Sequence, residues 1–348
     1  MPGFKTLVRA ASWFVGAVLF GGHAAAADAY IRVVDVGNGL CVVGQVPGGH
    51  AFLYDAGDKG TYCLDAVRSL VPGDTIDVVV LSHSDADHIG ELPAILAEKR
   101  AGTIFHSGDA HLDMTAAILA ERAAITQSGA TERNLAIRAL DPVDDDHPRV
   151  YKLGDATLTL VAGWSDGDLT MGPGEIKLPK PEHNNALSLV VRLNYGGHSA
   201  LLTGDTVGKL LTDRGQSPCH YAERSMVENQ AAWPIRSDVL IGQHHGGNNA
   251  STKCFIQAVH PTYVVFSAGH KNYHHPNGAT AARFMAAGVL PTNMFRTDRG
   301  DDEGPPEWIY GSFAGCVDKP GDDDVEIWLP ATPTEPIRIQ YRSAKPGC

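Results

Sequence analysis

Short apolar runs that stop at polar turns recur along the chain and predict alternating strands and helices. The clearest run is residues 78–81, three valines followed by a leucine, which is typical of a strand buried on both faces. Residues 89–97 follow with apolar positions at helical spacing. The polar residues between the two segments are therefore expected to form a strand-to-helix turn.

The rest of the chain continues this pattern. We expect strands or hairpins at 30–57, 103–106, 150–164, 187–202, 325–329 and 337–341, a helix at 113–125, and alternating strands and helices from residue 239 onward. Residues 164–185 are rich in Gly, Pro and charge and predict a loop, which either faces a substrate or is only an exposed connection. No internal repeat or linker divides the chain, so a single domain is preferred.

The amino-terminal residues predict export. Lys5 and Arg9 precede an apolar stretch at 10–20, and four alanines at 24–27 offer a cleavage site, so residues 1–27 have the regions of a secretory signal peptide. The apolar stretch is short for a membrane span, although an uncleaved anchor is the alternative. We expect a secreted or periplasmic mature protein without stable membrane association.

Cysteine usage agrees with an oxidising compartment. The chain has six cysteines and no C-x-x-C pair, which favours at least two disulfides over thiolate metal sites. The pair Cys316 and Cys348 is the first expectation, because both lie in the carboxy-terminal residues 301–348. Cys41, within an expected strand, could instead be a free cysteine of the core.

The polar turn after residue 81 carries the most informative chemistry. His83, Asp85, Asp87 and His88 form an H-x-D-x-D-H pattern, in which one metal could take the first pair and a second metal the other pair. An aspartate that merely caps the helix is the alternative interpretation, but capping explains neither histidine.

This turn resembles the metal-binding motif of the metallo-β-lactamase superfamily, whose usual form is H-x-H-x-D-H. Three further strand ends match the same family: Tyr54-Asp55-Ala56-Gly57, Leu201-Leu202-Thr203-Gly204-Asp205 and His244-His245-Gly246. More narrowly, the chain resembles the hydrolase domain at the carboxyl end of the competence DNA-uptake protein ComEC. That resemblance rests on Asp35-Val36-Gly37-Asn38-Gly39, Ser188-Leu189-Val190-Val191, Tyr273-His274-His275-Pro276 and Thr297-Asp298-Arg299-Gly300.

The resemblance implies the fold and its extent. It implies an α/β (α+β) protein, an αββα sandwich in which two sheets pack face to face between outer helices. The hydrolase domain would cover residues 28–300, and residues 301–348 would form an extension packed on the same domain. Motifs of a single site that run from Asp55 to His275 agree with one domain, because they could not converge if the chain divided between them.

The resemblance also implies residue roles. Asp205 would bridge two metals, Asp87 would bind the second metal and orient the attacking hydroxide, and at least one of His244 and His245 would bind metal. His183 lies where the family usually has its middle histidine ligand, although related sequences often have only an asparagine there, as at Asn185.

Two residues are expected to act beside the metals. Asp55 would orient a ligating histidine without binding metal itself. His275 would contact the substrate or stabilise a developing oxyanion, with a structural loop histidine as the alternative. Other histidines, His106 among them, have no comparable sequence context and are expected to be structural.

The expected cofactors are two divalent ions, zinc or manganese. Asp85 stands where most of the superfamily has histidine, and a carboxylate favours harder ions without excluding zinc. Two cations about 3.5 to 4 Å apart can bridge a hydroxide and clamp substrate oxygens, so no nucleophilic side chain is needed.

The expected substrate is a phosphodiester, and DNA is one candidate. The net charge of −12 disfavours general attraction of nucleic acid, so a local basic patch would be needed. Candidate contacts are Lys177, Lys180, Lys271 and Arg299, which lie near site motifs. Hydrolysis of a lactam or lactone, and a non-catalytic secreted binding module, are the alternatives. The oligomeric state is left open.

Overall fold

The computed structural model describes residues 27–107, 114–134, 149–163, 171–213, 219–269, 273, 275–298, 308, 321 and 323–343. The expected signal peptide apart from Ala27, the candidate substrate contacts Lys271 and Arg299, and the expected pair Cys316 and Cys348 lie outside these residues. Within the described residues, no helix is both long enough and apolar enough to cross a membrane.

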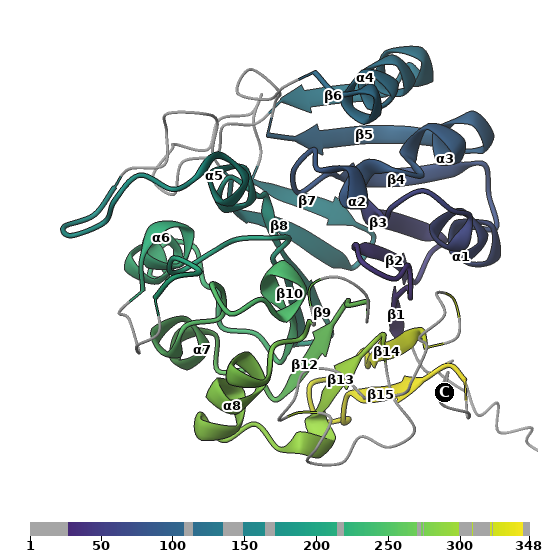
Figure 1. Ribbon diagram of the computed structural model, residues 1–348. Coiled ribbons are helices and arrows are strands. Elements are labelled where there is room, and N and C mark those ends of the chain that lie inside the picture. The colour runs from purple at the N-terminus through teal and green to yellow at the C-terminus, as the bar shows by residue number, and fades with distance from the viewer. Residues whose placement is uncertain are drawn as a thin grey trace, which may run out of the picture.

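Two mixed sheets form the centre of the molecule (Figure 1). The first has the order β15 (Arg338–Tyr341), β14 (Val325–Leu329), β1 (Ala29–Val33), β2 (Cys41–Val46), β3 (His50–Ala56), β4 (Thr75–Val80), β5 (Arg100–His106) and β6 (Thr131–Asn134). The second has the order β13 (Met294–Arg296), β12 (Tyr263–Phe266), β11 (Val239–Ile241), β10 (His198–Leu202), β9 (Val190–Tyr195), β8 (Ala156–Ala162) and β7 (Val150–Leu153). Pairing is parallel from β3 to β6 and from β10 to β13.

Helices cover the outer face of each sheet (Figure 1). The first sheet is covered by α1 (Tyr62–Leu70), α3 (Leu92–Glu98) and α4 (Ala116–Ser128). The second is covered by α6 (Tyr221–Asn229), α7 (Lys253–Val259) and α8 (Gly278–Ala286). Shorter elements are α2 (Ala86–Ile89), α5 (Lys180–Ala186) and the 3-10 turns η1 (Gln243–Gly246) and η2 (Pro291–Asn293).

Alternation along the strands builds the layers. In β10, Ala200 and Leu202 point into the core between the sheets, whereas Leu201 points toward the outer helices. In β3, Phe52 and Tyr54 likewise face the opposite sheet. Because both faces of these strands are buried, they read as continuous apolar runs in the sequence. The expected αββα sandwich is confirmed.

The structure changes one detail of the sequence interpretation and shows how the carboxy-terminal strands pair. Residues 164–185 were expected to be a loop, but α5 begins at Lys180, where Pro179 precedes the first helical turn. At the other end of the chain, β14 pairs antiparallel with β1, and β15 pairs with β14. β14 and β15 therefore extend the first sheet at its edge, whereas Trp308 packs against the second sheet.

Two disulfides join neighbouring elements. Cys41 of β2 is bonded to Cys63 of α1, and Cys219, just before α6, is bonded to Cys254 of α7. The expectation of at least two disulfides is confirmed. Cys41 is fully buried, as a core cysteine would be, but it is not free.

Candidate metal centre

The first group of site residues lies in the turn between β4 and α2. β4 ends at Val80, and His83, Asp85, Asp87 and His88 follow within one extended segment and one helical turn. Asp85 occupies the N-cap position of α2, yet its side chain makes no capping hydrogen bond. The capping interpretation of this turn is therefore wrong for Asp85, which lines a pocket instead.

The second group comes from the ends of two parallel strands of the other sheet. Asp205 follows β10, and His244 and His245 lie in η1, just after β11. The His244 amide donates to the Gly204 carbonyl at 3.0 Å, which ties the two strand ends together. His244 and His245 have φ values of 47° and 54°, a conformation that ordinary residues rarely adopt and that occurs preferentially at functional sites.

Asp205 lies between the two groups. One of its carboxylate oxygens, Oδ1, is 3.3 Å from His88 Nε2. The other, Oδ2, is 3.5 Å from His245 Nε2, 3.8 Å from His244 Nε2 and 4.0 Å from His83 Nε2. A single carboxylate thus lies within 4.0 Å of histidines from both groups, as expected for a residue that contacts two cations.

The donor set fits divalent metal ions. His83 Nε2, His88 Nε2, His245 Nε2 and Asp205 Oδ1 are buried and have no hydrogen-bond partner among the described residues. Leaving such atoms buried and unsatisfied is costly unless a ligand uses them. Potential ligand atoms form two groups, and within each group all the atoms lie within 4.8 Å of one another. The groups are His83, His88 and Asp205, and Asp87, His88 and His245. Imidazole and carboxylate sets of this kind suit zinc and manganese.

Asp55 contacts His88, one of these histidines. Its fully buried carboxylate is 2.8 Å from His88 Nδ1 and accepts hydrogen bonds from the amide and hydroxyl of Ser82 at 2.6 and 2.7 Å. A proton on Nδ1 held by Asp55 leaves the Nε2 lone pair of His88 directed into the cluster.

The paired histidines, which the sequence could not separate, have different partners. His245 Nδ1 is 2.8 Å from the Ser267 carbonyl oxygen, so it donates there and leaves Nε2 free as a ligand. His244 Nδ1 is 2.8 Å from Asn249 Oδ1, and its Nε2 is 3.1 Å from Asn185 Nδ2. His245 therefore has the arrangement of a metal ligand, whereas both ring nitrogens of His244 already contact amides.

Opposite charges dominate the electrostatics of the cluster. Burial alone would lower the pKa of His88, but the carboxylates of Asp205 and Asp55 raise that pKa well above its usual value. Burial would raise the pKa of Asp205, yet His245 and His88 hold that pKa well below its usual value. Metal ions would compete with protons for these histidines, so binding should release protons.

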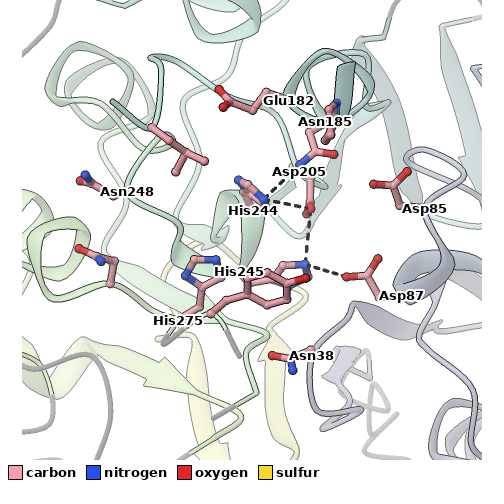
Figure 2. A pocket seen from close by; sticks show the side chains of 14 residues that line it. Asn38, Asp85, Asp87, Glu182, Asn185, Asp205, His244, His245, Asn248 and His275 are labelled. Atoms are coloured by element: carbon pink, nitrogen blue, oxygen red, sulfur yellow. Dashed lines mark hydrogen bonds and ion pairs between the residues drawn. The ribbon is translucent and has the colours of Figure 1, made fainter. Parts of the chain in front are cut away.

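A cavity of about 490 Å³ opens directly onto the cluster (Figure 2). Asp85, Asp87, Asp205 and His245 lie at its floor, and His275 lies on its wall, with its ring centroid 5.8 Å from that of His244. The remaining lining residues are Asn38, Pro181, Glu182, Asn185, Leu211, His244, Asn248, Tyr273 and Asn277.

Not every expected residue lines this cavity. His183 lies in α5 and is half-buried, but it belongs to neither set of ligand atoms, and its helix neighbour Asn185 faces the cavity instead. Lys177 and Lys180 are exposed and do not line the cavity.

Several lining residues were not expected as site residues, notably Glu182, Asn248 and Asn277. Asn38 and Tyr273 belong to segments that carry the family resemblance, which was the only sequence signal for them.

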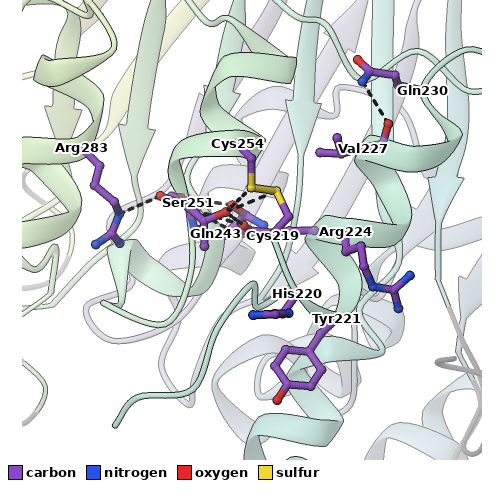
Figure 3. Close-up of a disulfide and its surroundings, with 12 residues drawn as sticks. Cys219, His220, Tyr221, Arg224, Val227, Gln230, Gln243, Ser251, Cys254 and Arg283 are labelled. Atoms are coloured by element: carbon purple, nitrogen blue, oxygen red, sulfur yellow. Dashed lines mark hydrogen bonds between the residues drawn. A yellow bond between two sulfur atoms is a disulfide. The ribbon is translucent and has the colours of Figure 1, made fainter. Parts of the chain in front are cut away.

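A polar network around Gln243 connects η1 to the neighbouring loops (Figure 3). Gln243 donates from Nε2 to the Thr206 hydroxyl at 2.8 Å, and its Oε1 accepts from both the amide and hydroxyl of Ser251 at 3.1 Å. Thr252 follows, and its hydroxyl contacts the buried carboxylate of Glu223 and lies 3.2 Å from Cys254 Sγ. The disulfide between Cys219 and Cys254 thus lies beside the loop that fixes η1.

The chain is similar to known proteins along most of its length. A family model described as the metallo-beta-lactamase superfamily matches residues 34–270. The chain is 28% identical over 275 residues to competence protein ComA of Neisseria gonorrhoeae, covering 78% of this chain and 31% of that protein. It is 26% identical over 243 residues to ComE operon protein 3 of Bacillus subtilis, covering 69% of this chain and 25% of that protein. The chain thus spans at most about a third of these relatives.

Solved structures with a related arrangement include the metallo-beta-lactamase fold protein YhfI from Bacillus subtilis, with a TM-score of 0.43, 13% identity, and coverage of 77% of this chain and 95% of that chain. Another is zinc-bound PqqB from Methylobacterium extorquens, with a TM-score of 0.42, 10% identity, and coverage of 76% and 97%. The family model matches more than half of the chain and includes the strand ends from Asp55 to His245. The chain therefore belongs to the metallo-β-lactamase superfamily and is a distant homologue of the competence proteins.

Proposed function

We propose that this protein is a hydrolase that binds two divalent cations and cleaves phosphodiesters. The observation that carries the proposal is the convergence, at the floor of an open cavity, of buried imidazole and carboxylate atoms that make no hydrogen bond. A purely structural cluster would satisfy these atoms with one another, whereas a catalytic metal centre keeps them directed at the substrate space.

The residues divide into two ligand groups. His83 and Asp85 would hold one cation, Asp87, His88 and His245 would hold the other, and Asp205 would contact both. When bound, such a cation pair polarises substrate oxygens and promotes loss of a proton from water near neutral pH. Asp85 supplies a hard oxygen ligand, which favours manganese at least as much as zinc.

The protein's own side chains would complete the reaction. Asp87 has a partly exposed carboxylate at the cavity floor, so it can accept a hydrogen bond from the attacking water. His275 reaches the same space from the opposite wall and can donate to the leaving oxygen. Asn185 can hold His244 in place, since its amide nitrogen lies 3.1 Å from that ring.

A phosphodiester is favoured over a lactam by chemistry and by homology. Oxygen-rich ligand sets favour hard cations, and hard cations favour phosphate oxygens. The similarity to competence proteins makes DNA one candidate. The net charge of −12 limits general attraction of long nucleic acids, so a small or terminal phosphodiester is the better match.

The test combines metal analysis with a substrate panel. Metal-free protein would be reconstituted with zinc or manganese and assayed on bis(4-nitrophenyl) phosphate, a chromogenic cephalosporin, and single- and double-stranded DNA. We expect about two ions per chain, manganese activity at least equal to zinc activity, and faster phosphodiester cleavage than lactam opening.

Two variants sharpen this test. Asp87→Ala should reduce turnover roughly 10³-fold, whereas His106→Ala should retain it because His106 pairs with Glu132 outside the cavity. Preferential lactam opening with a strict zinc requirement would assign a lactam hydrolase instead. Protein that retained no metal would indicate a non-catalytic binding module.

We propose further that the mature protein is exported after removal of residues 1–27. The two disulfides support an oxidising compartment. Amino-terminal sequencing of periplasmic and secreted fractions should find a start near Asp28. A cytoplasmic product that retains Met1 would contradict this proposal.

A further inference from the structure

The rim of the cavity differs from its floor in charge. The floor holds three carboxylates and His245, whereas the other described lining residues, which form the rim, are mainly amides, one leucine and aromatic rings. Glu182 is the single charged residue among these rim residues, and no described lining residue is a lysine or arginine. A substrate group that reaches the rim would therefore meet no lysine or arginine among the described lining residues to balance a second phosphate.

Three rings form a nearly parallel series from the floor to the solvent. The rings of His245 and His275 have centroids 6.4 Å apart and an interplanar angle of 17°. The rings of His275 and Tyr273 have centroids 5.9 Å apart and the same angle of 17°. Tyr273 ends the series and remains 65% exposed. An exposed aromatic face that continues such a series is a natural platform for another flat ring.

Two amides beside this platform have their oxygens engaged within the protein. Asn248 Oδ1 accepts a hydrogen bond from Arg283 Nη1 at 3.0 Å, and Asn277 Oδ1 accepts one from the Ala279 amide at the start of α8, also at 3.0 Å. The amide nitrogens therefore remain as the donors of these side chains on the cavity wall. Donors of this kind complement carbonyl oxygens on the edge of a flat heterocycle.

We infer that the rim recognises the nucleoside part of a nucleoside phosphodiester, with the base stacked on Tyr273. The amide nitrogens of Asn248 and Asn277 donate to oxygens of the base or its sugar, while the phosphodiester lies over the floor. This inference rests on the proposed phosphodiesterase activity and specifies its substrate class. The uncharged base and sugar suit a rim whose described lining residues include no lysine or arginine, and their recognition would let a protein of charge −12 select a nucleotide substrate.

Two esters with the same leaving group test the inference. The substrates are thymidine 5′-(4-nitrophenyl phosphate) and methyl 4-nitrophenyl phosphate, which differ only in the group that would reach the rim. Base stacking on an aromatic side chain typically changes binding by a factor of about ten or more. We expect the wild-type kcat/KM to favour the thymidine ester by at least about tenfold, mainly through KM.

Variants identify the residues responsible. Tyr273→Ala should remove most of this preference, whereas Tyr273→Phe should keep it because the ring face is retained. Asn277→Ser should reduce the preference while preserving the helix cap, since serine caps helices as well as asparagine does. Tyr62→Ala is the matched control, because Tyr62 is a 39% exposed tyrosine on α1 that does not line the cavity.

The outcomes separate this inference from the proposed function. Equal kcat/KM for the two esters, or a preference that Tyr273→Ala leaves intact, would overturn the stacking inference while phosphodiester hydrolysis stands. Failure to cleave either ester would overturn the proposed function. Calorimetry of metal-loaded protein with thymidine 5′-monophosphate and methyl phosphate then still decides the inference: tighter binding of the nucleotide that Tyr273→Ala abolishes supports it, and equal binding refutes it.

Discussion

The two halves of the site are built in different ways. The first sheet supplies His83, Asp85, Asp87 and His88 from one short turn. The second sheet supplies Asp205 and the histidines of η1 from two separate strand ends. Of the six described non-glycine residues with positive φ, only Asp55 belongs to the first half, whereas the other five follow residue 205. The first half uses local chain geometry, and the second half depends on neighbouring segments that hold it.

Each half also has a disulfide beside its site, but the two have different surroundings. Cys63 Sγ lies 4.0 Å from the Asp55 carbonyl oxygen, and Cys41 pairs with Ala56 in the sheet. Cys219 and Cys254 instead lie beside Thr252, in the loop that supports η1 (Figure 3). The comparison indicates that the first disulfide reinforces regular structure, whereas the second reinforces a turn with an unfavourable backbone conformation.

Removal of the residue that joins the halves should have the largest effect. Asp205→Ala takes away the oxygens shared by both ligand groups, so bound metal should fall from about two ions per chain and turnover should fall roughly 10³- to 10⁴-fold. Metal content by mass spectrometry and rates on the phosphodiester measure both effects. Asp74→Ala, an exposed carboxylate away from the cavity, is the control. Unchanged metal content in Asp205→Ala would show that the halves bind metal independently.

The disulfides should affect stability similarly but metal binding differently. They close loops of 22 and 35 residues, so replacing either pair by serine should cost roughly 3 to 4 kcal/mol in the free energy of unfolding. Of the two double variants, only the one that combines Cys219→Ser and Cys254→Ser should weaken binding of the ion held by His245. We expect a loss of about tenfold in affinity, because the disulfide that supports the loop beside η1 is removed. Urea unfolding and metal titration measure the two effects. Equal loss of metal affinity in both double variants would remove the distinction between the halves.

Glu223 should make stability depend on pH in the second half. Burial raises the pKa of this fully buried carboxyl to about 7. Because the folded-state pKa exceeds the unfolded value, stability should fall as pH rises from about 4.5 to about 7 and then level off, by roughly 3 kcal/mol. Glu223→Gln should lack this fall. Urea unfolding of chelator-treated wild-type and Glu223→Gln protein at pH 5 and pH 8 tests the effect. An equal change in the free energy of unfolding of both proteins between these pH values would disprove it.

The residues that contact the histidines should show the smallest difference between the two halves, which is a difference in metal affinity. Asp55→Asn should weaken metal binding by about 10- to 100-fold, since His88 loses the carboxylate 2.8 Å from its Nδ1. Asn249→Ala should have a smaller effect on metal binding, because His244 does not belong to either set of close ligand atoms. Competition with a chromogenic chelator measures both affinities. A larger loss in Asn249→Ala would make His244 a direct ligand.

Much of the site was predictable because its residues follow strands. The sequence order of a buried strand, a polar turn and a helix placed His83 to His88 correctly, and the parallel strands before Asp205 and His244 predicted a common edge. Asp55 lies 2.8 Å from His88 Nδ1, since a carboxylate at an adjacent strand end can reach the motif, and its role in orienting that histidine stays a prediction. The choice between His244 and His245 was not predictable, because it depends on Ser267, Asn249 and Asn185.

The sequence by itself determined the superfamily, the layered fold and the turn that carries His83 to His88, because these follow from local periodicity and from motifs adjacent along the chain. Only the tertiary structure decided the pairing of Cys41 with Cys63 and of Cys219 with Cys254, and the aromatic and amide rim at Tyr273 and Asn277. Such pairings join residues distant in sequence, and hydrophobic periodicity contains no information about which distant polar side chains meet. Packing of the two sheets brings those side chains together, and their contacts then set their chemistry.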